Sequence, residues 1–340
     1  MTLRWGICSA GKVSHDFIVA LKTLPADHKI VAIASSSLKR AQDYAKHHGI
    51  GRAYGSYDQL ARDPDIDVVY VGSINTQHLA QTLLFLRAKK NVLCEKPMGM
   101  NAREVHDMVQ TARDNNVFLM EGFWTRFFPV SEQIRTALCQ KTLGNVKVLR
   151  AQMGIRMDNI PRLVDKKLGG GVILDLGCYC IQFASMVFGP EMPKSIVASG
   201  LLYETGVDET VSIILNYSGN CQAVLNVTIM IDLPGEATIG GTEGIIKVPD
   251  HMNSPTTMFL KGNRWEWPLP PSPEPLYFEH DIGLRYEAEH VRECLQKGLK
   301  ESPIMPLRES ETIAHIMDEA RKQVGVSYEQ DRRRDGAMIA

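Results

Sequence analysis

Lys96 is the residue whose type and position first suggest chemistry. It belongs to Glu95-Lys96-Pro97, which follows the apolar run Asn91–Cys94. The run predicts a buried strand, and open α/β sheets bind their ligands beyond the carboxyl ends of their strands. Pro97 fixes the backbone beside the lysine. We therefore predict that Lys96 is the pivot of an active site to which Glu95 also belongs. The alternative is a surface Lys-Pro turn.

Asp175 and Tyr179 form a second candidate pair. They follow the triple glycine 169–171, and if a helix begins there they stand at positions i and i+4 on one face. A carboxylate and a phenol on the same face of an apolar helix are unfavourable unless both have polar partners. The pair is therefore a candidate for the active site. The alternative is that the two side chains are half-buried and serve only as each other's hydrogen-bond partners.

A turn near the N-terminus has the pattern of a phosphate site. The apolar run 3–8 predicts a strand, and apolar residues recur at helical spacing from Val13 to Leu21. In the turn, Ser9, Gly11 and Ser14 stand where the dinucleotide fingerprint has three glycines. The first N–H groups of a helix lack partners and bind anions. We expect a pyrophosphate turn, rather than a plain strand-to-helix loop, formed by Ser9, Gly11, Lys12 and Val13.

The second strand, residues 29–35, bears on the choice of cofactor. In an NAD site, an Asp or Glu at the end of this strand accepts a hydrogen bond from the ribose 2′-hydroxyl. Here the strand ends in serines, and two cations follow: Ser35, Ser36, Lys39 and Arg40. Hydroxyls and cations without an acid suit a 2′-phosphate, so we predict NADP, with NAD less favoured. The alternative is that the cations only decorate the first turn of a helix.

Further candidates lie at the ends of other elements. Ser73, Asn75 and His78 follow the apolar strand 67–72, and we expect them near the nicotinamide ribose. A histidine at such a junction is also a common packing or capping residue. The stretch 122–129 surrounds an arginine with aromatic side chains, which suits a substrate-pocket wall or else a hydrophobic hinge. We assign Trp124 and Arg126 to the cofactor, and to the substrate Trp124, Phe127 and the later Phe278.

The order of predicted elements defines an α/β chain of two domains. Strands and helices alternate over the first 120 or so residues, as in a doubly wound parallel sheet. Later strands joined by short loops predict a mostly antiparallel sheet. They are residues 146–156, 195–202, 210–216, 223–229, 236–239 and 245–249. We expect a nucleotide-binding domain at 1–121, a substrate-binding and dimerisation domain at 122–330 whose last helix docks near the first domain, and a tail at 331–340.

Composition excludes several classes of protein. A chain of 340 residues exceeds the size of most single cores. The net charge is −1 and no segment carries a basic stripe, so we expect no nucleic-acid partner. The seven cysteines are odd in number and lack Cys-x-x-Cys spacing, which favours a reducing, cytoplasmic location without a metal site. No signal peptide is evident at Met1, and Asp175 interrupts the most apolar stretch, so we expect no membrane span.

Taken together, four motifs resemble a known family. The relaxed glycine turn, Glu95-Lys96-Pro97, Trp124-x-Arg126 and Gly170-Gly171-x-x-x-Asp175-x-Gly177-x-Tyr179 stand in one order from about residue 3 to about residue 324. The chain is similar in this to glucose-fructose oxidoreductase, inositol dehydrogenase and their relatives. The resemblance implies an N-terminal Rossmann domain and a C-terminal α/β domain whose large open sheet forms a homodimer. It also implies that Tyr179 is the catalytic acid or base, with Lys96 and Asp175 beside it.

The resemblance also implies an activity. It points to NADP-dependent oxidation of trans-dihydrodiols of aromatic hydrocarbons to catechols, or of D-xylose and related aldoses at C1 to the lactone. Members with these activities usually carry an arginine at Ser36, His-Pro at Asn75-Thr76 and a phenylalanine at Met153, a further candidate substrate contact. These departures bear on the NADP assignment and on the aromatic pocket. The alternatives are an NADPH-dependent reductase of another carbonyl or sugar derivative, and a catalytically silent NADPH-binding sensor or scaffold.

Overall fold

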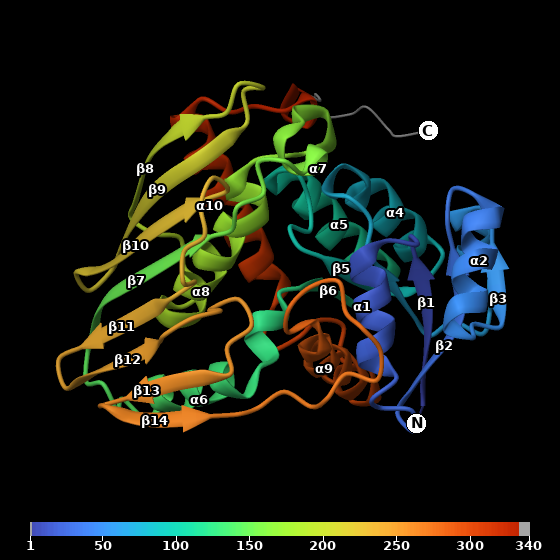
Figure 1. The fold of residues 1–340 in the computed structure, drawn as a ribbon, viewed down its shortest axis with the longest axis horizontal. Helices are drawn as coiled ribbons and strands as arrows, with labels where there is room; N and C mark the ends of the chain where they lie inside the picture. The colour runs from blue at the N-terminus through green and yellow to red at the C-terminus, as the bar shows by residue number, and fades with distance from the viewer. Residues whose placement is uncertain (1, 333–340) are drawn as a thin grey trace. The chain divides into compact units, whose positions relative to one another are not determined.

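The computed structural model describes residues 2–332, which pack as two compact units (Figure 1). The first unit comprises the described residues up to Gly99, with Arg103–Trp124 and Leu269–Leu307. The second comprises Met100–Ala102, Thr125–Pro268 and the described residues from Arg308 onward. The chain thus changes unit next to Trp124, three residues beyond the predicted boundary, and returns to the first unit for 269–307. Most of the predicted tail lies outside the described residues.

The first unit is built on a six-stranded parallel sheet in the order β3-β2-β1-β4-β5-β6. This is the strand order of the predicted Rossmann fold. The chain runs from the central β1 to one edge of the sheet, and then returns to the centre and continues to the other edge. Most of the strands are buried apolar runs, which is typical of parallel sheets covered on both faces, whereas the short edge strand β3 is half-buried and was not predicted. They are β1 (Leu3–Cys8), β2 (His28–Ala34), β3 (Arg52–Tyr54), β4 (Val68–Val71), β5 (Asn91–Glu95) and β6 (Leu119–Gly122).

Helices connect these strands through crossovers, whose right-handed sense places helices on both faces of such a sheet. In the second of them, Ser37 accepts the N–H of Arg40 at the start of the helix, and Gly49 ends it with φ of 73°. The last helix of the unit, from the returning segment, packs against the first. The helices are α1 (Lys12–Leu21), α2 (Leu38–His48), α3 (Tyr57–Ala61), α4 (Asn75–Arg87), α5 (Ala102–Asn115) and α9 (Leu284–Gln296).

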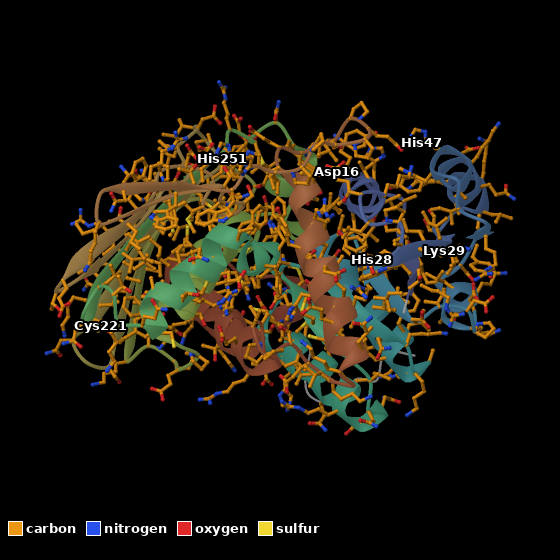
Figure 2. All side chains as sticks on the ribbon, turned by 90° about the horizontal axis from the view of Figure 1, so that it is seen from below. Asp16, His28, Lys29, His47, Cys221 and His251 are labelled. Carbon is orange, nitrogen blue, oxygen red and sulfur yellow. The ribbon has the colours of Figure 1, made fainter. Side chains whose placement is uncertain are left out.

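The second unit holds an eight-stranded sheet in the order β14-β13-β12-β11-β7-β10-β9-β8. Neighbouring strands are antiparallel except β7 and β10, so the predicted, mostly antiparallel open sheet is confirmed. Cys221, labelled in Figure 2, begins β10. The strands are β7 (Val146–Gly154), β8 (Ser195–Leu202), β9 (Asp208–Tyr217), β10 (Cys221–Thr228), β11 (Ala237–Gly241), β12 (Gly244–Val248), β13 (Thr257–Leu260) and β14 (Asn263–Glu266). The prediction had missed β13 and β14.

Helices cover one face of this sheet. Buried and exposed residues alternate along β9 and β10, and the buried side of β7 and β10 contacts α8. The helices of the unit are α6 (Pro129–Cys139), α7 (Pro161–Val164), α8 (Cys178–Phe188) and α10 (Leu307–Val324). Short 3₁₀ helices occur at Trp124–Phe127, Lys166–Leu168, Asp281–Gly283 and Glu329–Arg332. The opposite face, including β8, keeps much of its side-chain surface exposed.

The helix after the triple glycine differs from its prediction in one respect. Ile173–Gly177 forms a π-helical turn that leads into α8. Asp175 lies in the π turn and Tyr179 in the first turn of α8, so the two residues do not stand in one regular α-helix as predicted. The stretch Lys166–Phe188 is long and apolar enough to cross a membrane, but 89% of its apolar window is buried within the protein. That burial is what a core helix shows.

Candidate active site

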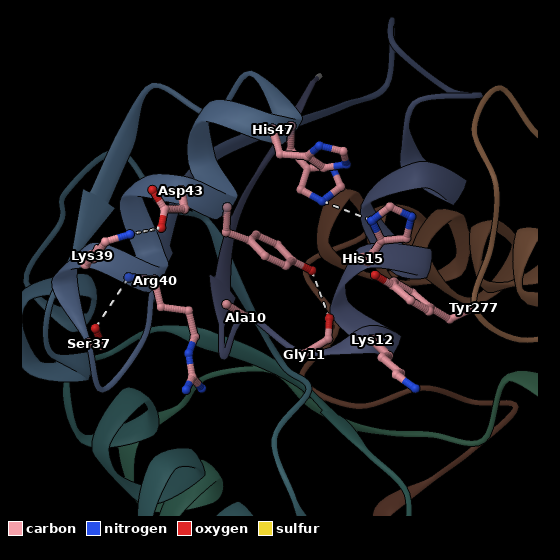
Figure 3. A pocket seen from close by; sticks show the side chains of 12 residues that line it. Ala10, Gly11, Lys12, His15, Ser37, Lys39, Arg40, Asp43, His47 and Tyr277 are labelled. Carbon is pink, nitrogen blue, oxygen red and sulfur yellow. Dashed lines mark hydrogen bonds and ion pairs between the residues drawn. The ribbon is translucent and has the colours of Figure 1, made fainter.

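A pocket of about 650 Å³ opens in the first unit beside the N-terminal ends of α1 and α2 (Figure 3). This volume is within the range of small-molecule sites. Four of the residues predicted to bind a dinucleotide line it: Gly11, Lys12, Lys39 and Arg40. The other lining residues are Ala10, His15, Ser37, Asp43, Tyr44, His47, His48 and Tyr277.

The end of the pocket at α1 is suited to phosphate. The first turn of α1 contains no acidic residue, and no side chain caps it. Its N–H groups and partial positive charge are therefore available to an anion. The Tyr44 hydroxyl donates to the Gly11 carbonyl oxygen at 2.9 Å and ties α2 to this turn. Lys12 lies with its ammonium 5.5 Å from the centre of the Tyr277 ring. The donor set thus fits a pyrophosphate.

The end of the pocket at α2 carries hydroxyl and cationic groups. Ser37 and Arg40 lie in the first turn, and the Lys39 ammonium pairs with the Asp43 carboxylate at 2.8 Å. Lys39 is thereby partly neutralised, which makes Arg40 the stronger candidate for a 2′-phosphate. Ser35 is buried at the end of its strand, and its hydroxyl accepts the Ser37 N–H at 3.5 Å. Of the contacts predicted in the glycine turn and after the second strand, four do not line the pocket: Ser9, Val13, Ser35 and Ser36.

Lys96 directly follows β5, at the carboxyl edge of the parallel sheet. The Glu95 carboxylate accepts the Tyr70 hydroxyl at 2.7 Å and the Lys96 N–H at 3.3 Å. Burial raises the pKa of Glu95. The Lys96–Pro97 peptide bond is cis, and the following N–H, that of Met98, donates to the Glu121 carboxylate at 2.8 Å. The lysine therefore stands on a backbone held by buried carboxylates.

Ser73 and His78 help to hold this edge. The His78 imidazole bridges the carbonyl oxygens of Pro97, at 2.9 Å, and Ser73, at 3.0 Å. The Ser73 hydroxyl donates to Gln81 at 2.7 Å. Asn75 is buried at the start of α4. These contacts fit the packing alternative for His78, and its place near the nicotinamide ribose stays a prediction.

Three further carboxyl groups lie buried in the first unit. Asp16 accepts the N–H groups of Tyr277 and Phe278 at 2.9 to 3.0 Å. Burial raises the pKa of Asp281 and of Glu287 well above the ordinary range, and neighbouring carboxyl groups add to both shifts. Sequence reasoning missed this cluster because the residues come from α1 and from the segment that returns after the second sheet.

Asp175 and Tyr179 are both buried in the second unit, each 8% exposed. The Arg162 guanidinium donates to the Asp175 carboxylate at 3.1 Å. The Asp175 backbone N–H donates to the carbonyl oxygen of Gly171 at 3.3 Å. Arg162 is a partner that no sequence pattern indicated.

The triple glycine fixes where this helix begins. Gly171 has φ of 124°, and a Cβ there would lie 2.5 Å from the Asp208 carboxylate and 2.8 Å from the Tyr328 hydroxyl. The Asp208 carboxylate accepts the N–H of Ile173 at 2.6 Å, and Tyr328 donates to the Gly170 carbonyl oxygen. Burial raises the pKa of Asp208. Glycine is required at 171 because only a residue without a side chain lets these groups approach.

The remaining residues predicted to contact cofactor or substrate differ in how deeply they are buried. Arg126 is buried in the second unit, where its guanidinium donates to Glu309 at 2.6 Å and to the Gln182 side chain at 3.0 Å. These contacts satisfy its charge within that unit. Trp124 and Met153 are buried, Phe127 is half-buried and Phe278 is 48% exposed.

The pocket also contains three histidines that the sequence analysis did not single out. His15 comes from α1, and His47 and His48 end α2. Burial, the Lys22 cation and the neighbouring histidines lower the pKa of His48 to about 4, so its imidazole is neutral at neutral pH. Adjacent histidines at a helix end were the available signal, but only the fold brings His15 to them.

Comparisons with known families cover most of the chain. Residues 3–123 match an oxidoreductase family with an NAD-binding Rossmann fold. Residues 131–247 match the GFO/IDH/MocA C-terminal domain. The two matches fall on the parallel sheet of the first unit and on the larger sheet of the second.

Two relatives align along almost their whole length. The chain is 56% identical over 329 residues to the trans-1,2-dihydrobenzene-1,2-diol dehydrogenase of Xenopus tropicalis, which covers 96% of this chain and 100% of the relative. The Homo sapiens protein of the same name is 48% identical over 334 residues, or 98% of this chain and 100% of that protein.

Solved structures with the same fold are more distant. A levoglucosan dehydrogenase in complex with NADH and levoglucosan superimposes with a TM-score of 0.83 at 18% identity, over 96% of this chain and 98% of the other. A 3-ketoreductase from Actinomadura kijaniata in complex with NADP gives 0.79 at 21% identity, over 95% and 98%. At these identities the likeness concerns the fold.

Proposed function

This chain belongs to the GFO/IDH/MocA oxidoreductase family, and we propose that it is an NADP-dependent dehydrogenase of trans-dihydrodiols of aromatic hydrocarbons. It is a dehydrogenase that uses a nicotinamide dinucleotide. The finer assignment rests chiefly on its similarity, over nearly the whole chain, to relatives named for trans-1,2-dihydrobenzene-1,2-diol. D-Xylose and related aldoses, oxidised at C1 to the lactone, are the second substrate class.

The preference for NADP is supported by the pocket at α2. Ser37 and Arg40 offer a hydroxyl and a guanidinium, and a guanidinium binds phosphate through two parallel hydrogen bonds. The second strand ends without the acidic residue that would favour a free ribose. Related enzymes usually carry an arginine at the position of Ser36. We therefore assign the 2′-phosphate contact to Arg40, because Lys39 is paired with Asp43.

The reaction needs a hydride acceptor, which the bound nicotinamide supplies, and a base for the hydroxyl proton. The C–H bond breaks with its electron pair, the O–H proton goes to the Tyr179 oxygen, and a carbonyl group forms. For a dihydrodiol, a proton shift then gives the catechol. The Lys96 ammonium holds the substrate oxygen and stabilises the tyrosinate, with Asp175 as polar neighbour.

The proposal also covers the oligomeric state and the cellular location of the chain. We propose a homodimer formed through the open face of the larger sheet, where Val197 and Leu201 of β8 are 52% and 63% exposed. All seven cysteines are free, which supports a reducing, cytoplasmic location. Sedimentation equilibrium tests the dimer. Leu201→Asp is expected to give monomers, and an unchanged mass for that variant, or a monomeric wild type, would exclude this interface.

A substrate panel tests the activity. Purified protein is mixed with NADP⁺ or NAD⁺ and with trans-1,2-dihydrobenzene-1,2-diol, D-xylose or D-glucose, and nicotinamide absorbance is followed. The proposal expects the highest kcat/KM for the dihydrodiol with NADP⁺. Reduction of a carbonyl by NADPH, without oxidation of any of these substrates, would favour the reductase alternative. Dinucleotide binding without turnover in either direction would favour the silent sensor or scaffold.

A further inference from the structure

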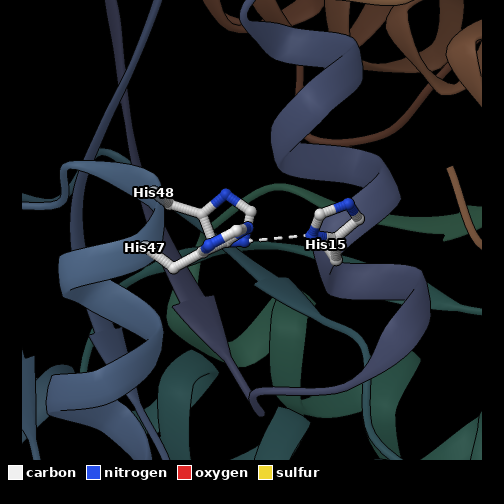
Figure 4. Close-up of side chains that lie close together, drawn as sticks. All are labelled: His15, His47 and His48. Atoms are coloured by element: carbon white, nitrogen blue, oxygen red, sulfur yellow. Dashed lines mark hydrogen bonds between the residues drawn. The ribbon is translucent and has the colours of Figure 1, made fainter. Parts of the chain in front are cut away.

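Three imidazoles meet at one point in the first unit (Figure 4). His15 projects from α1, and His47 and His48 from the last turn of α2. One ligand nitrogen from each lies within 4.8 Å of the other two. His15 and His48 are buried, whereas His47, which is labelled in Figure 2, is exposed. The cluster also lines the pocket, which gives it access to solvent.

The spacing of the nitrogens suits a metal ion. His15 Nδ1 and His48 Nε2 are 3.2 Å apart. Zinc binds histidine nitrogen at about 2.0–2.1 Å in tetrahedral sites, so two such ligands stand about 3.3–3.4 Å from each other. The two buried imidazoles therefore already have the separation of a ligand pair. The exposed His47 offers the third nitrogen, within 4.8 Å of the other two.

The surroundings of His15 fix which nitrogen faces the cluster. His15 Nε2 lies 3.0 Å from the Pro275 carbonyl oxygen, which can only accept a hydrogen bond. Nε2 therefore carries the proton, and Nδ1 points its lone pair at His48. Metal-binding histidines characteristically donate their other N–H to a carbonyl or carboxylate group in this way.

Two carboxylates offset part of the positive charge that Lys22 places near the cluster. Lys22 is paired with Glu274 at 2.6 Å, and the Asp16 carboxylate lies 4.0 Å from His15 Nε2. His47 and His48 stand at the C-terminal end of α2, where the helix dipole favours positive charge.

We propose that His15, His47 and His48 bind one divalent transition-metal ion of the zinc class, with a fourth position open to the pocket for water. Imidazole nitrogen is a preferred ligand for zinc, copper, nickel and cobalt, whereas calcium and magnesium take oxygen. The bound ion ties the end of α2 to α1. Cysteine spacing could not indicate this site, because its ligands are histidines that only the fold brings together.

Cobalt(II) titration of the full chain without dinucleotide tests the site. We expect one equivalent to give the visible absorption of a tetrahedral ion, without a thiolate charge-transfer band, and Zn²⁺ to displace it. His47→Gln and His15→Gln should each weaken Zn²⁺ binding about tenfold or more, since even outer-shell changes cost about 10–100-fold. His315→Gln, an exposed histidine on α10, is the matched control and should not change affinity.

Several outcomes would overturn the proposal. Equal affinity of wild type and His47→Gln would exclude the cluster, and this variant is expected to fold because His47 is exposed. A thiolate charge-transfer band would show that a cysteine binds the ion, such as the exposed Cys139. The titration needs neither substrate nor cofactor, so its failure leaves the dehydrogenase proposal unaffected.

Discussion

At the scale of single residues, Tyr179 is the side chain on which the proposed proton transfer depends. Tyr179→Phe removes only the hydroxyl, so the buried ring keeps its packing. We expect kcat to fall about 10²-fold or more, the contribution typical of general acid–base groups, while NADPH binding is retained. Turnover and a fluorescence titration with NADPH measure the two quantities separately. Near-native turnover would remove Tyr179 from the mechanism.

Arg40 is the residue that tests the cofactor preference. Arg40→Ala should raise the Kd for NADP⁺ about 10- to 100-fold, because a hydrogen bond to a charged group contributes about 1.5–3 kcal/mol. Binding of NAD⁺ should not change, since it has no 2′-phosphate. Lys39→Ala is the matched control and should have a smaller effect, because Lys39 is already paired with Asp43. Equal losses for NADP⁺ and NAD⁺ would contradict the assignment.

Sequence reasoning located residues whose neighbours in the chain define their position. Lys96 could be placed at a strand end because the apolar run stops just before it. Arg126 could be seen among aromatics, but not its partner Glu309, 183 positions later. The histidine cluster was missed for the same reason, since His15 lies far along the chain from His47 and His48.

At the scale of elements, the start of the helix that carries Asp175 and Tyr179 depends on Gly171. Gly171→Ala combines a strained φ with a Cβ pressed against Asp208 and Tyr328. Gly206→Ala is the matched control, because it has φ of 83° and nothing within 4 Å of its Cβ. Strain alone costs about 1–3 kcal/mol. We expect Gly171→Ala to lower the free energy of unfolding by about 2 kcal/mol more than Gly206→Ala, as measured by urea denaturation; equal losses would refute the steric account.

The regular elements could be predicted and the irregular ones could not. Apolar runs with helices between them indicated the parallel strands except the short edge strand β3, and runs with strand character indicated most of the larger sheet. The π turn at Ile173–Gly177 depends on Asp208 accepting the N–H of Ile173, a contact from a distant strand. The missed strand β14 is exposed along its length, so it lacks the burial pattern that reveals strands.

At the scale of the whole molecule, buried carboxyl groups make stability depend on pH. Burial and the neighbouring Glu95 and Asp281 raise the pKa of Glu287 well above its ordinary value of 4.5. The folded chain thus holds a proton that the unfolded chain has lost. The free energy of unfolding should fall as pH rises from about 4.5 through the raised pKa, because ionising the folded carboxyl group is unfavourable.

Glu287→Gln should flatten this decline, since an amide does not ionise. Glu293→Gln on the same helix is the control, because Glu293 is exposed and should leave the profile unchanged. Urea denaturation at a series of pH values measures both. An unchanged slope in Glu287→Gln would show that this carboxyl group is not the source of the pH dependence.

The doubly wound architecture of the first unit could be predicted, because strands and helices alternate along the chain and their crossovers are right-handed. The place of residues 269–307 could not, since this segment returns to the first unit only after the second sheet is complete. The sequence order of motifs also identified the family, which the full-length relatives confirm.

The most direct test of the proposed function is transfer of label from the substrate. trans-1,2-Dihydrobenzene-1,2-diol carrying deuterium on its carbinol carbons is incubated with NADP⁺ and the purified chain, and the nicotinamide product is analysed by NMR. We predict NADPH with deuterium at C4, formed together with catechol. NADPH without deuterium, or no NADPH at all under conditions where the dinucleotide binds, would contradict the account.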